Sequence, residues 1–377
     1  MNNRFARVLL SLFIPLAVVG CNTLAKRDDS GVIVARRAQI RSSTAVVAAD
    51  LLEVNRGEVV DILESVDVPD PNDNTKRETW LRVRAHDEES TEGWIESRNV
   101  MPNDVLGDSR KLADEDTGIP AQATGQLRAS SNLRLTPDRS GNDNIMMRLD
   151  SGSSFQIVGW KRVPKPKSSE TIESDVAPKA GTVQQGGSRT ARSEENTEPE
   201  EPNELWYKVR LPQSISPAPA GWIYGKQVEL SVPSDIIFYR TGREFVAWQR
   251  LDAETGEKDG SSNDKDAAKE ARPGSWIILE KSSSNQPHSV DEPDFDRIYV
   301  LGYDKRNQEH YTAYRSPDVR GFLPLRVQRH GENTVFVVRM QDQNGQISEA
   351  QYSAYKDARG ILRINAPTLP NNDRRRR

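Results

Sequence analysis

The side chains that most often carry out chemistry are sparse in this chain. Cys21 is the only cysteine among 377 residues. The four histidines, His86, His288, His310 and His330, stand singly, without the close spacing that a zinc site requires. Nucleophile-elbow, phosphate-loop and dinucleotide-binding motifs are also missing from the sequence. We therefore predict no catalytic residue, no metal site and no cofactor.

The single cysteine ends a segment typical of an export signal. Arg4 and Arg7 provide a basic start, and Val8–Val19 is an apolar run too short to span a bilayer comfortably. The ending Val18–Cys21 resembles the bacterial lipobox. That resemblance implies that residues 1–20 are a lipoprotein signal peptide and that Cys21 is lipidated as the first mature residue. An ordinary secretory signal with a chance cysteine is the alternative.

Lipidation of Cys21 would make the membrane a partner through the acyl chains, since several chains anchor a protein almost permanently. Residues 21–31 would then be a tether. Asn22 follows the cysteine, where the Gram-negative pattern uses Asp for inner-membrane retention, so Asn22 favours the outer membrane facing the periplasm. No thiol would remain for a disulfide.

Composition limits the partners of the chain. Its length allows two or three domains, and 29% of its residues are charged. The formal net charge is −4. A mildly acidic chain has no general attraction for nucleic acid, so we expect no nucleic-acid partner.

Four short sequence blocks occur twice in the same order, which predicts an internal repeat. Each block has the alternation or turn glycine of a short strand. In the first copy the blocks are "AQIRSS" (Ala38–Ser43), "LEVNRGEVVDIL" (Leu52–Leu63), "WLRVR" (Trp80–Arg84) and "EGWIES" (Glu92–Ser97). In the second copy they are "SNLRLTPD" (Ser131–Asp138), "MRLDSGSSFQIV" (Met147–Val158), "WYKVR" (Trp206–Arg210) and "AGWIYG" (Ala220–Gly225).

This order of blocks resembles the bacterial SH3 domain, present here twice, at 32–102 and 125–232. The resemblance implies two small β-barrels that bind peptidoglycan stem peptides or other envelope proteins. The first copy departs from the family in lacking a proline after its Ile40-Arg41 pair. The second copy carries a long insertion, 163–203, whose Ser, Thr, Glu, Pro and Gly content predicts disorder.

The remaining segments complete an all-β fold with disordered linkers. Residues 103–124 are polar and acidic and are predicted to be a linker, and 368–377 to be a basic, disordered tail. Residues 233–367 are predicted to form an antiparallel β domain, with an Asn344-Gly345 hairpin turn. Charged residues within 252–273 could form one or two helical turns. The strands expected in this domain are 235–240, 244–251, 275–281, 296–304, 310–315, 321–330, 333–342, 347–356 and 360–366.

Aromatic side chains at matched positions are the candidate binding residues, because tryptophan and tyrosine stack on sugars and peptides. Trp94 and Trp222 follow a glycine into a strand, which favours a place in the core. Trp80 and Trp206 begin their strands beside the variable loop, where SH3-like grooves lie, and are expected to be partly exposed. Candidate ligand-binding residues are therefore Trp80, Trp206, Tyr207 and Tyr224.

Together these features predict a non-enzymatic, lipid-anchored protein of the cell envelope that binds cell-wall peptide or partner proteins. A structural or scaffold lipoprotein, acting through protein–protein contacts, is the main alternative. An enzyme with an unrecognised site in the C-terminal domain is the third hypothesis, and a deep pocket lined by paired carboxylates would support it.

Overall fold

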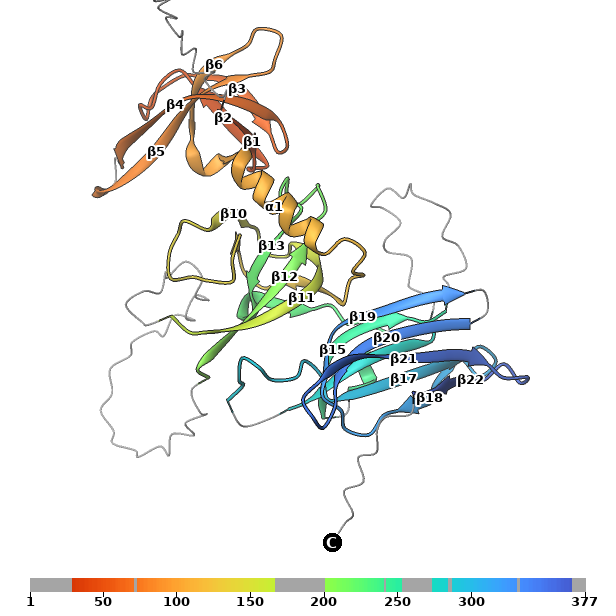
Figure 1. The fold of residues 1–377 in the computed structure, drawn as a ribbon. Coiled ribbons are helices and arrows are strands. Elements are labelled where there is room, and N and C mark those ends of the chain that lie inside the picture. Colours follow the sequence, from red (N-terminus) through yellow and green to blue (C-terminus); the bar gives the residue numbers. More distant parts are fainter. Residues whose placement is uncertain are drawn as a thin grey trace, which may run out of the picture.

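The structure is a computed structural model, and it describes residues 29–70, 73–166, 201–240, 242–252, 273–283, 287–330 and 333–367. Apart from one α-helix and short 3₁₀ turns, its elements are antiparallel strands, which confirms the all-β fold class (Figure 1). The signal peptide, Cys21, most of the 163–203 insertion, the predicted helical turns and the tail lie outside the described residues.

The first seven strands form one curled sheet, which we call barrel 1. Its elements are β1 (Asp29–Ile33), β2 (Arg37–Arg41), β3 (Asp50–Asn55), β4 (Val59–Asp70), β5 (Asp73–Ala85), β6 (Glu92–Glu96), the 3₁₀ turn η1 (Ser97–Asn99) and β7 (Val100–Pro102). The strands lie in the order β3-β2-β6-β5-β4-β1-β7. The curled sheet encloses a small core that includes Ile33, Ile40, Val54, Val83 and Ile95.

The second copy of the sequence blocks forms barrel 2 with the same topology. Its elements are β8 (Ala123–Leu127), β9 (Ser131–Arg134), β10 (Ile145–Leu149), β11 (Ser154–Pro164), β12 (Asn203–Arg210), β13 (Ala220–Tyr224), the 3₁₀ turn η4 (Gly225–Gln227) and β14 (Val228–Leu230). The order β10-β9-β13-β12-β11-β8-β14 matches barrel 1 strand for strand. The predicted internal repeat is therefore a repeat of structure.

The repeated Gly-Trp pair has a packing reason in both barrels. A Cβ on Gly93 would lie 2.6 Å from the carbonyl oxygen of Arg41 in β2. A Cβ on Gly221 would lie 2.5 Å from Cε of Met146 in β10. At Gly93 a neighbouring backbone leaves no room for a Cβ, and at Gly221 a Cβ would force the Met146 and Leu133 side chains to move.

A helix connects the two barrels in the segment predicted to be a linker. Helix α1 (Asn103–Glu115) follows β7 directly and lies along barrel 2 (Figure 1). Its buried residues are Leu106 and Ser109. The Ser109 hydroxyl donates to the Ala220 carbonyl at 2.6 Å and accepts from the Ala220 amide at 3.2 Å. Lys208 of β12 forms ion pairs with Glu115 and the adjoining Asp116 at 2.7 and 2.8 Å. The helix thus fixes barrel 1 relative to barrel 2.

The C-terminal domain contains two four-stranded antiparallel meanders. The first is formed by β15 (Arg243–Arg250), β16 (Trp276–Ser282), β17 (Arg297–Asp304) and β18 (Glu309–Arg315). The second is formed by β19 (Gly321–His330), β20 (Asn333–Gln341), β21 (Ile347–Lys356) and β22 (Leu362–Asn365). Gly345 adopts a φ of +84° in the β20–β21 turn, which confirms the predicted Asn344-Gly345 hairpin.

The prediction of a strand at 235–240 is wrong. The segment contains instead a 3₁₀ turn, η5 (Ile237–Tyr239). Ile236 is fully buried whereas Phe238 is 88% exposed, so the segment does not alternate as a half-buried strand does. The other eight strands expected in this domain are present, with ends shifted by a few residues.

The first meander is buried on both faces. Ile277, Leu279 and Val300 point into a core shared with the second meander. Ile278 and Leu301 point the other way and join the core of barrel 2. Because neighbouring residues of a strand face opposite sides, this double burial explains why "WIILE" and "IYVLG" are continuous apolar runs.

Gln122 connects barrel 2 to the C-terminal domain. Its side chain is fully buried, donates from Nε2 to the Leu325 carbonyl at 2.9 Å and accepts from the Leu325 amide at 2.6 Å. A second connection joins Trp160 of β11, which donates from Nε1 to Asp294 at 2.6 Å. The Asp294 carboxylate also accepts from the Leu323 amide at 2.9 Å.

Replacement of Gln122 tests this connection. Gln122→Leu would leave the buried Leu325 amide without its partner, which costs about 1–3 kcal/mol, whereas the Leu325 carbonyl still accepts from Gln249 at 2.9 Å. We expect chemical denaturation to show a loss of unfolding free energy in that range. Gln346→Leu, in an exposed turn, is the control and is expected to change stability by at most about 0.5 kcal/mol. Equal effects of the two substitutions would contradict the role of Gln122.

A buried carboxyl group on β16 makes stability depend on pH. Glu280 is 1% exposed, and burial raises the pKa of its carboxyl group although Arg315, Arg243 and Arg297 act to lower it. The folded state therefore holds this proton more tightly than the unfolded state. Stability falls as the pH rises from the unfolded-state pKa of this carboxyl group through its higher folded-state pKa. We expect Glu280→Gln to raise the free energy of unfolding at neutral pH and to change it little below about pH 4. Denaturation at both pH values measures the difference.

Candidate functional site

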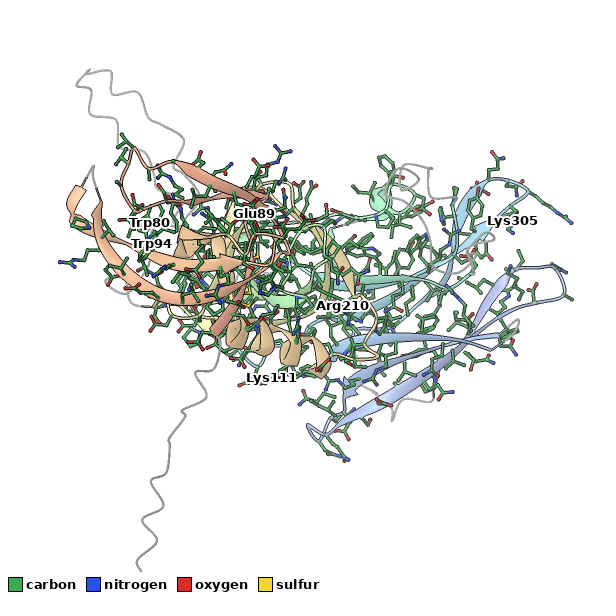
Figure 2. All side chains as sticks on the ribbon, turned by 90° about the horizontal axis from the view of Figure 1, so that it is seen from above. Trp80, Glu89, Trp94, Lys111, Arg210 and Lys305 are labelled. Atoms are coloured by element: carbon green, nitrogen blue, oxygen red, sulfur yellow. The ribbon has the colours of Figure 1, made fainter. Side chains whose placement is uncertain are left out.

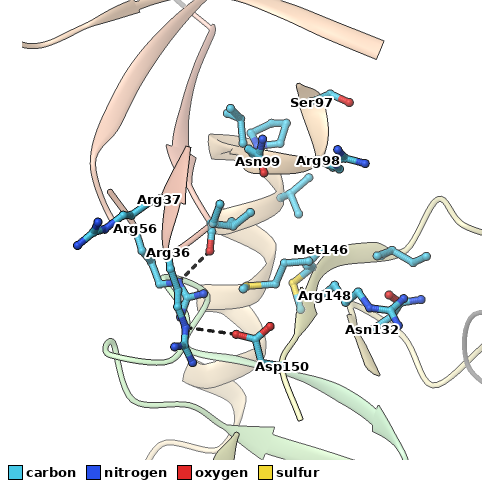
Figure 3. Close-up of a pocket in the computed structure, with 17 residues that line it drawn as sticks. Arg36, Arg37, Arg56, Ser97, Arg98, Asn99, Asn132, Met146, Arg148 and Asp150 are labelled. Carbon is cyan, nitrogen blue, oxygen red and sulfur yellow. Dashed lines mark hydrogen bonds and ion pairs between the residues drawn. The ribbon is translucent and has the colours of Figure 1, made fainter. Parts of the chain in front are cut away.

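A cleft lies between the two barrels (Figure 3). This interbarrel cleft has a volume of about 930 Å³. Its lining contains five arginines and one acidic residue: Arg36, Arg37, Arg56, Arg98, Arg148 and Asp150. Such a local excess of positive charge contrasts with the net charge of −4 of the whole chain.

The arginines come from separate elements that the fold brings together. Arg36 and Arg37 lie where the chain enters β2, and Arg56 lies in the turn between β3 and β4. Arg98 comes from η1, and Arg148 lies across the cleft on β10 of barrel 2. Figure 3 shows the first three on one wall and Arg148 on the other, with Met146 between them.

Two of the arginines hold the walls together. Arg56 donates from Nε to the Val34 carbonyl at 2.8 Å and from Nη1 to the Ile215 carbonyl of barrel 2 at 2.6 Å. Arg36 forms an ion pair with Asp150 at 3.3 Å. Burial lowers the pKa of the Arg56 guanidinium, and the charge of Arg36 acts in the same direction while Asp150 opposes it. Arginine nevertheless remains charged at any physiological pH.

Arg37 and Arg148 are open to a ligand, whereas Arg98 pairs with Glu96 at 2.6 Å. Arg37 is exposed and has one acidic neighbour, Glu53, at 3.8 Å. Arg148 is exposed and makes no side-chain hydrogen bond or ion pair with any described residue. Guanidinium groups bind carboxylates and phosphates through paired N–H donors. With buried Met146 and Met147 also in its lining, the cleft suits an anion attached to an apolar body.

The prediction that Trp80 and Trp206 are partly exposed is wrong. Trp80 is 6% exposed and Trp206 is fully buried, whereas Trp94 and Trp222 are only partly buried. Figure 2 shows Trp80 and Trp94 in barrel 1, at the opposite end of the molecule from Lys305. Trp80 lies beside residues 43–46 of the loop after β2, and Trp206 contacts the Tyr224 ring.

Trp80 nevertheless lines a second opening, which we call the Trp80 groove. Its volume is about 530 Å³, and it shares no lining residue with the interbarrel cleft. It lies between the loop after β2 and the ends of β4 and β5. The lining consists of Arg41, Ser43, Thr44, Ala45, Val46, Val68, Pro69, Glu78, Trp80 and Glu96.

The corresponding position in barrel 2 is occupied by an arginine of the same chain. Arg139 donates to both carboxylate oxygens of Glu204 at 3.1 and 3.0 Å, and both side chains are buried. Its guanidinium also lies 4.8 Å from the centre of the Tyr224 ring. Tyr224 in turn contacts Trp206, with ring centres 5.5 Å apart.

Tyr207 does not join these residues. It forms an edge-to-face contact with Trp160, with ring centres 6.2 Å apart, where barrel 2 meets the C-terminal domain. Burial raises the pKa of its hydroxyl group to about 12. The structure therefore brings together Trp206 and Tyr224, and separates Tyr207 and Trp80 from them.

The C-terminal domain has a pocket of about 440 Å³ lined by two aspartates, Asp252 and Asp357. Asp252 accepts from Arg250 at 3.0 Å and from the Ser275 amide at 3.0 Å. Asp357 accepts from the Ile361 amide at 3.0 Å and from Arg363 at 3.0 Å. Both carboxylates thus hold local turns. Among the described residues no group of three or more His, Cys, Asp and Glu side chains could hold a metal ion.

Sequence reasoning missed the interbarrel cleft and Arg139. The only local signal for the cleft is the adjacent pair Arg36-Arg37, and the other arginines are distant in sequence. Arg139 lies five residues beyond the block arginine Arg134, just as Val46 lies five residues beyond Arg41. Alignment of the two copies through this loop would have identified the difference.

No protein-family model matches the chain, and no curated protein matches its sequence. Among the described residues, no helix combines the length and the apolar character that crossing a bilayer requires.

The buried pair of Arg139 and Glu204 is open to a direct test. Arg139→Met would leave Glu204, whose side chain is 1% exposed, without its ion-pair partner. We expect the free energy of unfolding to fall by about 3–5 kcal/mol, because an uncompensated buried charge is costly. Chemical denaturation measures the loss. The control is Val46→Met, at the 70% exposed residue that follows the block arginine of barrel 1 by the same five positions, where the change should stay within about 0.5 kcal/mol.

Proposed function

We propose that this chain is a non-enzymatic, lipid-anchored protein of the cell envelope that binds acidic cell-wall peptide in the interbarrel cleft. The convergence of five arginines on one opening that contains a single acidic residue carries the proposal. The resemblance of the repeated blocks to bacterial SH3 domains and of Val18–Cys21 to a lipobox supports the envelope setting.

The chemistry of the cleft matches that ligand class. Peptidoglycan stem peptides combine free carboxylates with small apolar side chains. Arg37 and Arg148 lie on opposite walls of the opening, so carboxylates along one peptide can contact both barrels at once. Met146 and Met147 provide the apolar surface between these charges, and methionine adapts to different ligand shapes.

The position of the two barrels adds to the argument. Arg56 and Arg36 connect the walls through contacts at 2.6 Å and 3.3 Å, so little ordering is needed when a ligand enters. A preformed site loses less conformational freedom on binding than two independent modules. A lipid on Cys21 would keep this site near the membrane, on the periplasmic side of the outer membrane in a Gram-negative cell.

Co-sedimentation with purified sacculi tests the proposal. We expect the full chain to sediment with sacculi and Arg37→Gln/Arg148→Gln to do so about 2- to 30-fold more weakly, because each lost exposed ion pair contributes about 0.2–1 kcal/mol. Binding of the wild-type chain should also weaken as salt is raised, since exposed charges are screened.

The matched control is Arg306→Gln/Arg359→Gln, which removes the same charge from exposed positions of the C-terminal domain. It is expected to sediment like the wild type. Equal recovery of the wild-type chain with and without sacculi, or equal weakening by the two double substitutions, would contradict cell-wall binding in the cleft.

A further inference from the structure

The two barrels place the same strand residues around the Trp80 groove and around Arg139. In barrel 1, Trp80 of β5 pairs with Glu96 of β6; in barrel 2, Trp206 of β12 pairs with Tyr224 of β13. Two residues before each tryptophan stands a glutamate, Glu78 or Glu204, on the same face of the strand. The groove of barrel 1 therefore keeps the carboxylate that binds a guanidinium in barrel 2.

In barrel 2 this guanidinium belongs to Arg139, in the loop after β9, and the corresponding loop of barrel 1 has no such arginine. In each loop the block arginine donates to a loop carbonyl, Arg41 to Val46 at 2.8 Å and Arg134 to Gly141 at 2.7 Å. Counted from the block arginine, the fifth residue is Arg139 in barrel 2 but Val46 in barrel 1, and Val46 is 70% exposed. Glu78 and Glu96 are consequently left at the edge of an open groove.

We propose that the Trp80 groove binds an extended peptide segment through an arginine side chain of that segment. The guanidinium takes the position that Arg139 takes in barrel 2, with Glu78 as its main acceptor and Glu96 as a second carboxylate. Trp80 forms part of the groove lining, and a planar cation packs well on an aromatic ring. This site is distinct from the interbarrel cleft and opposite to it in charge preference.

The loop beside the groove favours a peptide over a free cation. Ala45 and Val46 line the opening, and the neighbouring Val47 is 92% exposed. Apolar side chains on either side of the ligand arginine can cover this surface. Arg98 now pairs with Glu96 at 2.6 Å and lies 3.8 Å from Glu78, but its side chain is 70% exposed. Such an exposed pair is weak and is readily exchanged for a ligand cation.

Binding of a small peptide to the full chain tests the proposal. The probe is fluorescein-labelled Gly-Val-Arg-Val-Gly-amide, and its partner probe replaces arginine with citrulline, which keeps the shape and removes the charge. We expect fluorescence anisotropy to show binding of the arginine probe at least about tenfold tighter than that of the citrulline probe, because charge-assisted bidentate hydrogen bonds are lost.

Val46→Arg is the informative variant, since it places an arginine in the lining of the Trp80 groove, five residues beyond the block arginine as Arg139 is in barrel 2. We expect it to weaken binding of the arginine probe about tenfold, whereas Val46→Gln, similar in length and neutral, retains binding. Glu78→Gln should weaken binding without altering the fold, because its side chain is 34% exposed.

Three results would overturn the proposal. The first is no binding of the arginine probe at about 1 mM, the weakest affinity expected of such a site. The second is equal affinity for the citrulline probe, which would identify an apolar ligand. The third is equal binding by Val46→Arg and Val46→Gln.

Discussion

Burial of a small apolar seam between barrel 1 and barrel 2 is the interaction on which the other features depend. Val32, Val34, Met101 and Leu106 belong to the same core as the interior of barrel 2 and one face of the first C-terminal meander. Each such side chain contributes about 1.5–3 kcal/mol when fully buried. Because the only cysteine is Cys21, no disulfide can replace this burial. The seam keeps the arginines of two barrels in one cleft.

The two barrels have the same strand order but differ in the side chains of the loop that follows β2 or β9. Arg41 and Arg134 hold the backbone of their loops, so the side chains of those loops are free to differ. In barrel 2 the loop closes on its own glutamate, and in barrel 1 it leaves an opening beside Trp80. The same strand order therefore carries one closed loop and one open loop.

The sequence predicts the parts of this structure that rest on local patterns. Repeated blocks identify five of the seven strands in each barrel and miss β1, β7, β8 and β14. Apolar patterns identify most strands of the C-terminal domain. Helix α1 is not predicted from the sequence because Gly107 and a polar composition disfavour an isolated helix. Contacts with barrel 2, such as that of Ser109 with Ala220, stabilise it instead. The exposure of the tryptophans depends on how a loop folds over a strand, and the cleft depends on residues more than a hundred positions apart. Neither leaves a local signal.

The pairing of β1 has a mechanical consequence. The chain enters barrel 1 through this strand, which is hydrogen-bonded to β4 on one side and to β7 on the other. If Cys21 is tethered to a bilayer while the cleft holds a fixed polymer, tension acts along β1. Antiparallel hydrogen bonds lie perpendicular to the strands, so this load shears two ladders at once and does not unzip them bond by bond. Under the proposed function, the first strand is thus suited to carry force between the membrane and the bound cell-wall polymer.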